Sequence, residues 1–204
     1  YRGPSPITAA ILNGDRETGV TVQKLALKMD AGDILGVCSL PLSGRETAGS
    51  LSRTLAGMGA ELLVSALRGL EQGRIEGIRQ EESRATYCSL VNKDDGRIDW
   101  GADAGLIERM IRAYDPWPRA FTTWGGRRLN ILAGGVYPEA GEATGTAGGK
   151  PGLVLAVDNR YGILVNAGRG VLFVSSLQLQ SKKPLDWRSF LNGQKDFIGA
   201  LLGE

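Results

Sequence analysis

The sequence predicts an α/β segment, a polar linker and a small antiparallel β-barrel, in that order along the chain. Three observations predict this arrangement. Two runs with strand character precede a long amphipathic helix, and a polar stretch of poor periodicity follows it. From residue 120 onward, short apolar runs alternate with glycine-rich turns at spacings of about ten residues. The chain has 204 residues, enough for one large or two small domains with a real core.

The N-terminal segment contains one predicted helix and two predicted strands. The helix begins at Pro6, with Ser5 as a suitable N-cap residue and Gly14 as the stop. Residues 19–29 predict a strand, because β-branched residues alternate with polar ones at its start. Residues 33–42 predict a second strand that ends at a proline. Together these elements form the first part of the α/β segment.

A long helix is predicted over residues 47–73. Thr47 is a suitable cap and Gly73 ends the apolar pattern. Gly57 and Gly59 lower the helix propensity of this stretch, so we expect another element to pack closely against them. The apolar stripe of the helix steps by three or four residues through Leu51, Leu55, Met58, Leu62 and Ala66.

The remaining elements follow a shift in composition. Residues 74–87 are polar and aperiodic, which predicts a linker. A helix is predicted near 102–113, and the DPWP stretch that follows forbids further helix. The glycine-rich strands come next, with a predicted mobile loop at 139–151. A short terminal helix is predicted at 186–193.

Composition excludes several classes of protein. Hydrophobic residues make up 42% and charged residues 23% of the chain, as in soluble globular proteins. No apolar run approaches the roughly 18 residues that a membrane span needs. The two cysteines, Cys38 and Cys88, have no metal-binding spacing and are expected to be free thiols. Residues 121–204 hold nine lysines and arginines against six aspartates and glutamates, a net charge of +3 that weakly favours a polyanionic partner.

Asp30, in the stretch MDAGD, is the strongest local candidate for a functional residue. One interpretation is a turn, because aspartate favours turns and Gly32 tolerates unusual backbone angles. The other is a carboxylate at the end of a strand that accepts a proton or polarises a water molecule. A DxG turn by itself is a weak signal, so the residues alone leave both interpretations open.

Five stretches carry a resemblance to a known family and occur in its order along nearly the whole chain. They are YRGPSPITAAILNGDRETGVTV, MDAGDIL, ATY with DDGRIDW, IRAYDPWPRAF, and LQLQSKKPLDWRSFLNG. Together they resemble the methionyl-tRNA formyltransferase family. The DxG element is shared across folate-dependent formyltransferases, whereas the later elements are more specific to the methionyl-tRNA enzymes.

The resemblance implies the following architecture. Residues 1–73 would be the C-terminal part of a Rossmann-like formyltransferase domain, residues 74–95 a linker, and residues 96–204 an OB-like open β-barrel that binds tRNA. The parent enzyme would be cytoplasmic and monomeric, with no membrane partner. It would transfer a formyl group from 10-formyltetrahydrofolate to the methionine amino group of initiator methionyl-tRNA, without a metal.

The family's catalytic set is an asparagine, a histidine and an aspartate, and Asp30 matches the aspartate. The family's asparagine and histidine precede the YRG motif, where this chain begins, and the chain contains no histidine. The resemblance therefore implies an N-terminally truncated chain that is inactive alone. The implied folate-contacting residues are Arg2, Gly3, Leu27, Lys28 and Met29, and the implied tRNA-contacting residues are Arg127, Arg128, Lys182, Lys183 and Arg188.

Two alternatives stay open. The chain could come from a related folate-dependent enzyme that formylates another amine or hydrolyses formyl-folate, which would share the DxG element. The chain as given could also act as a non-enzymatic tRNA-binding fragment. A comparison of charged initiator tRNA with an amino-sugar nucleotide as substrates separates the first alternative, and a tRNA-binding assay beside a formylation assay separates the second.

Overall fold

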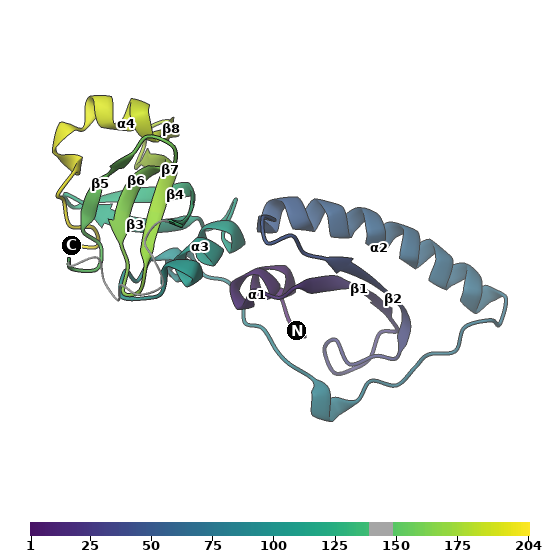
Figure 1. The fold of residues 1–204 in the computed structure, drawn as a ribbon. Coiled ribbons are helices and arrows are strands. Elements are labelled where there is room, and N and C mark those ends of the chain that lie inside the picture. Colours follow the sequence, from purple (N-terminus) through teal and green to yellow (C-terminus); the bar gives the residue numbers. More distant parts are fainter. Residues whose placement is uncertain (139–148) are drawn as a thin grey trace. The chain divides into compact units, whose positions relative to one another are not determined.

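The structure is a computed structural model that describes residues 1–138 and 149–204. The chain divides into two compact units, Tyr1–Val91 and Asn92–Glu204, which Figure 1 draws in purple to blue-green and in teal to yellow. We describe each unit by itself. Most of the predicted loop 139–151 lies outside the described residues.

The first unit is built on an antiparallel hairpin of β1 (Glu17–Gln23) and β2 (Ile34–Pro41). Its register pairs Glu17 with Pro41 and Val22 with Gly36, and the register shifts after Val22. The second predicted strand is confirmed, but the first ends at Gln23 rather than at residue 29. The N–H of Lys24 donates to the carbonyl of Asp33 at 2.9 Å, so the residues between them form a closed loop instead of a longer strand.

Helix α1 (Pro6–Asn13) has its predicted bounds. Pro6 occupies the first turn, and Gly14 adopts a left-handed conformation with φ of 69° and donates its N–H to carbonyls of the last turn. Ser5 stands at the N-cap position, but its side chain makes no capping hydrogen bond. The start of this helix therefore depends on the proline rather than on the serine hydroxyl.

Helix α2 (Ala48–Glu71) confirms the long predicted helix. Thr47 and Ser50 form a reciprocal capping box at its start. The helix lies along one face of the β1–β2 hairpin and buries Leu51, Leu55 and Ala66 from its predicted apolar stripe (Figure 1).

The two helix glycines differ. A Cβ on Gly59 would lie 3.2 Å from Cγ1 of Val20 in β1, so a strand does pack closely there. A Cβ on Gly57 would have no neighbour within 4 Å. The expectation of close packing is therefore confirmed at Gly59 and wrong at Gly57, which faces away from the hairpin.

Residues 74–91 return along the first unit and are bonded to it. Ile34 and Ile78 exchange both backbone hydrogen bonds, at 2.8 and 2.9 Å. Farther along, Arg2 forms a parallel bridge with Tyr87, through its own N–H to Thr86 and through the N–H of Cys88 to its carbonyl. The short 3₁₀ helix η1 (Glu82–Arg84) lies between these two attachments.

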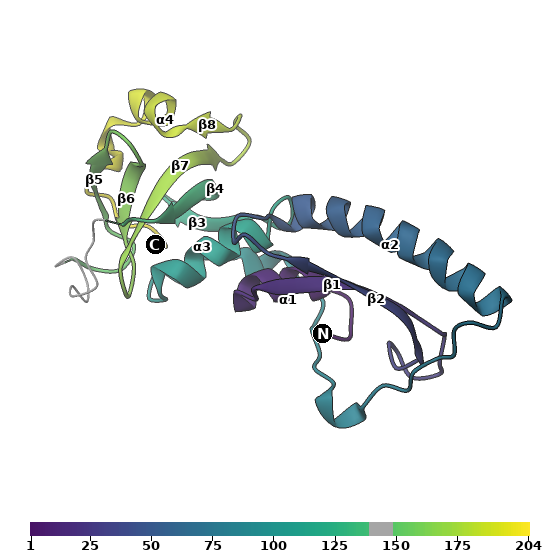
Figure 2. The same ribbon diagram turned by 45° about the vertical axis from the view of Figure 1, so that its right-hand side comes forward.

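The second unit is built on an antiparallel sheet of six strands. Its spatial order is β3–β4–β7–β6–β5, with β8 paired to β7, and Figure 2 shows these strands side by side. Among the described residues, β3 and β5 do not pair, so the sheet is open along this path and no closed barrel is seen. The strands are β3 (Ala120–Trp124), β4 (Arg127–Val136), β5 (Val154–Asp158), β6 (Gly162–Asn166), β7 (Val171–Leu179) and β8 (Leu185–Asp186). The chain as a whole is thus a mixed α/β protein.

Helices cover this sheet and complete its core. The predicted helix near 102–113 is α3 (Ala104–Ala113), capped by Asp103, and it packs on β4 and β7. Its apolar residues Ile107 and Ile111 are buried. The predicted terminal helix is α4 (Trp187–Gly193), and the 3₁₀ helix η3 (Lys195–Phe197) follows it. A second 3₁₀ helix, η2 (Lys93–Gly96), lies near the start of the unit. The core cluster includes Ile107, Leu129, Ile131, Ile163, Leu172, Leu177, Phe190 and Phe197.

Two further observations concern the whole chain. Cys38 and Cys88 are free thiols, as the sequence predicted. Within residues 1–138 and 149–204, no helix is long and apolar enough to cross a membrane.

Candidate functional site

Asp30 lies in the closed loop between β1 and β2, in a left-handed conformation with φ of 53°. The N–H of Gly3 donates to Oδ2 of Asp30 at 2.8 Å. The side-chain amide of Gln23, at the end of β1, approaches Oδ1 at 3.4 Å. Both carboxylate oxygens are therefore oriented by donors from two different segments, and the side chain does not simply close its own turn.

Asp30 lines an open pocket of about 600 Å³ in the first unit. The pocket is bounded by the N-terminal residues, by the hairpin face that α2 does not cover, and by residues 80–86. Its lining includes Gly3, Thr21, Gln23 and Gln80. A carboxylate and neutral amide groups thus face a space large enough for part of an organic substrate.

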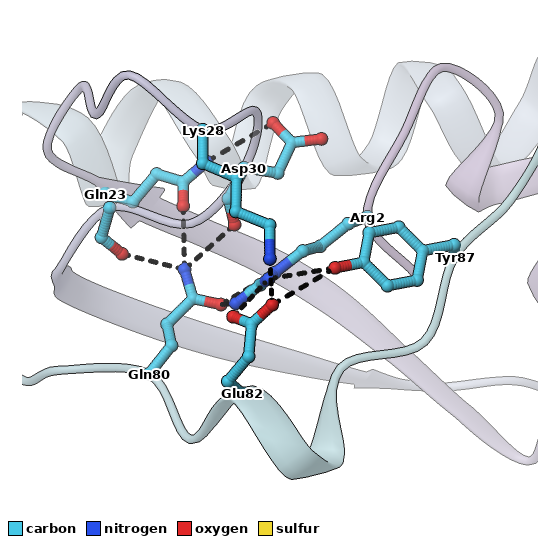
Figure 3. A network of polar contacts seen from close by, with 8 residues as sticks. Arg2, Gln23, Lys28, Asp30, Gln80, Glu82 and Tyr87 are labelled. Atoms are coloured by element: carbon cyan, nitrogen blue, oxygen red, sulfur yellow. Dashed lines mark hydrogen bonds and ion pairs between the residues drawn. The ribbon is translucent and has the colours of Figure 1, made fainter.

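Gln80 is the central residue of the polar network around Asp30 (Figure 3). Its Nε2 donates to Oε1 of Gln23 at 2.9 Å and to the backbone carbonyls of Asp30 and Gly32 at 3.0 and 2.7 Å. Its Oε1 accepts from Nε and Nη2 of Arg2 at 3.3 and 2.9 Å. The segment that the sequence marked as a linker therefore contributes a residue to the site.

Glu82 forms the second part of the network. Nη1 of Arg2 donates to its Oε2 at 2.9 Å, and Nζ of Lys28 pairs with its Oε1. Lys28 first and Arg2 second lower the pKa of Glu82 to about 2, and the same contacts raise the pKa of both cations. Arg2 is 7% exposed, whereas the side chain of Lys28 is 60% exposed. Arg2 is thus bound within the protein, and Lys28 stays accessible beside the site.

The other predicted folate-contacting residues lie close in sequence to Asp30 and differ in exposure. Leu27 and Met29 expose most of their side chains, as does Leu25. Gly3 has φ of 119°, and a Cβ there would lie 2.3 Å from the carbonyl oxygen of Cys88. Gly3 thus supplies its N–H to Asp30 from a position that only glycine fits.

Gly32 explains why a small residue follows Asp30 at this spacing. A Cβ on Gly32 would lie 1.7 Å from the carbonyl oxygen of Lys24, across the base of the loop. The two residues of the DxG element are therefore required for two separate physical reasons. The aspartate presents its carboxylate to the pocket, and the glycine lets the two sides of the loop approach.

Four of the predicted tRNA-contacting residues come from neighbouring segments of the second unit. Arg127 and Arg128 begin β4, and Lys182 and Lys183 follow β7 in the turn before β8. The N–H of Gln180 donates to the carbonyl of Arg128 at 2.9 Å, which places the two segments side by side. The structure thus groups these four cations at one end of two adjacent strands.

Arg128 and Arg188 have local partners. The guanidinium of Arg128 lies 3.5 Å from the ring centre of Phe121 and donates to Asn130, and burial lowers its pKa. Arg188 donates to the carbonyl of Asn159 at 3.0 Å in the turn between β5 and β6. Arg188 therefore engages a different turn from the one that carries the lysines.

Sequence reasoning missed Gln80 and Arg119. Gln80 lies in an aperiodic stretch, and its partners lie about fifty residues away, so no local pattern marks it. Arg119 follows the DPWP stretch with φ of 71° and donates to Gln178 of β7 at 2.6 Å. Its unusual position after two prolines was the available signal.

Within the described residues, no group of three or more histidine, cysteine, aspartate or glutamate side chains is placed to hold a metal ion.

Comparison with known families defines the class of protein. Residues 1–67 match the model described as "Formyl transferase", and residues 90–195 match "Formyl transferase, C-terminal domain". The chain belongs to the formyl transferase family. The match to the second model covers more than half of the chain and includes the whole six-stranded sheet.

Individual relatives are more particular. The chain is 44% identical over 97% of its length to the methionyl-tRNA formyltransferase of Treponema denticola, and 44% identical over 92% to that of Roseiflexus castenholzii. It spans 61% and 59% of these two relatives. The resemblance stated from the sequence motifs is therefore confirmed.

Solved structures show the same fold. A methionyl-tRNA formyltransferase from Clostridium thermocellum matches with a TM-score of 0.54 and 25% identity, covering 67% of this chain and 58% of that one. HypX from Aquifex aeolicus in complex with tetrahydrofolic acid matches with a TM-score of 0.69 and 22% identity. That second match covers 97% of this chain and 34% of the other, and supports the fold alone.

Proposed function

We propose that these 204 residues are part of an enzyme that transfers the formyl group of 10-formyltetrahydrofolate to the methionine amino group of initiator methionyl-tRNA. The observation that carries this proposal is the placement of Asp30. Its carboxylate is oriented by Gly3 and Gln23 on a pocket, in a chain 44% identical to enzymes of that name. The chain spans about three fifths of those relatives, so the activity is proposed for the longer protein.

In this proposal Asp30 is the catalytic residue that accepts the proton. The methionine amine attacks the formyl carbon, a carbon–nitrogen bond forms, and the bond to N10 of the folate breaks. The amine must lose a proton as the amide forms, and a carboxylate within reach can accept it directly or through one water molecule. The departing N10 takes up one proton as the amine gives one up, so the transfer balances without an oxidant.

The test is a formylation assay with the full-length protein that contains this chain. We expect charged initiator tRNA to be formylated and an amino-sugar nucleotide to be left unchanged. Asp30→Asn should lower kcat by about a hundredfold or more, because general-base catalysis contributes that much. Asp33→Asn is the matched control in the same loop. Equal activity of the Asp30 and Asp33 variants would contradict the assignment of Asp30.

We further propose the domain arrangement that the resemblance implied: a partial Rossmann-like domain over 1–73, a linker over 74–95 and an OB-like tRNA-binding domain over 96–204. The antiparallel, curved path of β3–β4–β7–β6–β5 supports an open barrel. The proposal includes a cytoplasmic, monomeric parent enzyme.

We propose that Leu27, Lys28 and Met29 contact the folate. Arg2 and Gly3 belong to the same site and support it. Exposed apolar side chains next to Asp30 suit the flat rings of a folate, and the accessible ammonium of Lys28 suits its carboxylates. Arg2 has its donors directed at Gln80, Glu82 and Tyr87. We therefore propose that Arg2 supports the folate site from within and does not itself contact the ligand.

We propose that the cations of the second unit bind tRNA phosphates. Arg127, Arg128, Lys182 and Lys183 lie at one end of β4 and β7, and Arg188 lies farther along the chain. Replacing Lys182 and Lys183 together by alanine should weaken tRNA binding and lower the slope of log K against log salt by about two. Lys93→Ala, in another segment, is the control. An unchanged slope and affinity would remove these lysines from the interface.

A further inference from the structure

We propose that Gln80 is a positioning residue for Asp30 and that Arg2 orients it. Gln80 acts through its amide, which holds the loop of Asp30 on one side and is held by Arg2 on the other. This inference rests on the proposed catalytic role of Asp30. The segment around residue 80 thereby takes part in the reaction, in addition to connecting the two units along the chain.

The orientation of the Gln80 amide follows from Arg2. A guanidinium has only donors, so the group that faces it must be an acceptor. Nε and Nη2 of Arg2 both lie within 3.3 Å of Oε1 of Gln80. Arg2 is 7% exposed, and its Nη1 is also bonded to Glu82 and Tyr87. A buried, multiply bonded cation thus fixes which end of the amide is the oxygen.

The NH₂ group of Gln80 must then face the opposite side, where three oxygens converge. They are Oε1 of Gln23 at 2.9 Å, the carbonyl of Asp30 at 3.0 Å and the carbonyl of Gly32 at 2.7 Å. The two carbonyls lie on either side of Ala31, so one side chain restrains the backbone on both sides of that residue. This restraint matters because Asp30 has φ of 53°, a left-handed conformation that is unfavourable for a residue with a Cβ.

Gln80 also reaches the Asp30 carboxylate through Gln23. Because Gln80 donates to Oε1 of Gln23, the Nε2 group of Gln23 is turned toward Oδ1 of Asp30, 3.4 Å away (Figure 3). The other oxygen, Oδ2, accepts from the N–H of Gly3, the residue next to Arg2. Arg2 therefore supports the carboxylate from both sides, through the backbone of Gly3 and through the two glutamines.

Two variants of Gln80 separate the two ends of its amide. Gln80→Glu keeps an oxygen for Arg2 and places a second oxygen against the three acceptors, which repel it. Gln80→Met keeps the length of the side chain and removes both ends. Glu81→Gln is the matched control, because the Glu81 side chain contacts Ser83 and Arg84 and lies outside the network around Asp30.

The first measurement is the kinetics of the full-length enzyme. We expect Gln80→Glu and Gln80→Met to lower kcat about tenfold or more, because small displacements of a catalytic group are costly. KM for both substrates should change less than about threefold, since Gln80 orients Asp30 without binding substrate. Glu81→Gln should match the wild type. If Asp30→Asn keeps full activity, the proposed function of Asp30 fails; if it is inactive but both Gln80 variants match the wild type, the inference about Gln80 is wrong.

The second measurement uses amide hydrogen exchange in the 204-residue chain and needs no activity. The N–H groups of Lys24 and Ala31 are hydrogen-bonded within the loop, to Asp33 and Lys28. We expect both to exchange faster in the two Gln80 variants, while amides of α2 keep their wild-type rates. Unchanged loop amides would overturn the inference, and so would equally faster exchange through α2, because Gln80 would then be only a general support of the first unit.

Discussion

Each of the two units of this protein is stabilised internally by a different kind of contact. The second unit has a continuous apolar core in which side chains such as Leu129, Leu172 and Phe190 are almost fully buried. In the first unit the buried apolar side chains are mainly those of α1 and α2, and Arg2 is the buried charged residue at the site. A carboxylate is thus placed by hydrogen bonds in one unit, while the other presents cations on a packed sheet.

This difference teaches where each unit is sensitive. A packed core loses stability when volume is removed, and it does so wherever the removal occurs. A hydrogen-bonded site loses its geometry when a donor, an acceptor or a close backbone contact changes, even if little apolar area is involved. The four changes below test this contrast, beginning with the largest expected effect.

Leu129→Ala should lower the free energy of unfolding of the second unit by about 2–5 kcal/mol, because it leaves a cavity in a closely packed core. Leu129 is 0% exposed. All four tryptophans of the chain, at 100, 117, 124 and 187, lie in the second unit, so urea unfolding followed by tryptophan fluorescence reports that unit. Leu185→Ala, at a residue 40% exposed, is the control. A loss below about 1 kcal/mol at Leu129 would show that the core relaxes freely.

Gly32→Ala should displace the Asp30 loop and cost the first unit about 1–3 kcal/mol, the usual range for overpacking. The added Cβ would lie 1.7 Å from the carbonyl oxygen of Lys24, which is backbone and cannot rotate away. Hydrogen exchange at Lys24 should become faster, and the tryptophan-detected transition of the second unit should stay in place. Exchange at wild-type rates would mean that the loop accommodates the methyl group.

Acid should release the contact of Glu82 with Lys28 and Arg2. These cations lower the pKa of Glu82 to about 2, below the value near 4.5 of an unperturbed glutamate, so the contact stabilises the folded unit fully above about pH 4.5. The stabilisation should fade as the pH falls from there toward 2. Amide exchange at Arg2 and Cys88, whose N–H groups form the adjacent bridge, measures it as a function of pH after correction for intrinsic rates. In Glu82→Gln this acid-dependent component should be absent, and its persistence would assign it to another group.

The smallest effect concerns the two glycines of α2. Gly57→Ala should stabilise the helix by about 0.5–1 kcal/mol, because alanine is the better helix former and the added Cβ meets nothing within 4 Å. Gly59→Ala should gain less, since its Cβ would lie 3.2 Å from Val20. Amide exchange in α2 compares the two variants. Equal gains would indicate that β1 yields without cost.

The sequence was sufficient for most elements and for the family. Thr47, Gly14 and the spacing of Leu51, Leu55 and Ala66 are local signals, so the two helices of the first unit could be placed close to their observed bounds. The motifs singled out Asp30 and indicated the family, and the comparisons confirm the family. The catalytic role of Asp30, and the roles of the cations, stay predictions.

The parts that the sequence did not predict depend on contacts between distant segments. The strand from residue 19 ends at Gln23 because Lys24 bonds to Asp33, and nothing in the alternation of apolar residues marks that closure. Gln80 was missed for the same reason, since two of its partners are carbonyl oxygens of a loop whose conformation is itself unusual. Patterns of side-chain polarity carry little information about which backbone carbonyl a side chain will find.

The parallel bridge between Arg2 and Tyr87 also has a mechanical consequence. The N–H of Arg2 is bonded to Thr86, and the N–H of Cys88 to the carbonyl of Arg2. When the chain is pulled between Tyr1 and the second unit, these two hydrogen bonds are loaded in shear, together with the side-chain bonds of Arg2. Tension therefore crosses from residue 2 to residue 88 and bypasses the hairpin and α2, so the loop that holds Asp30 is shielded from force until this bridge yields.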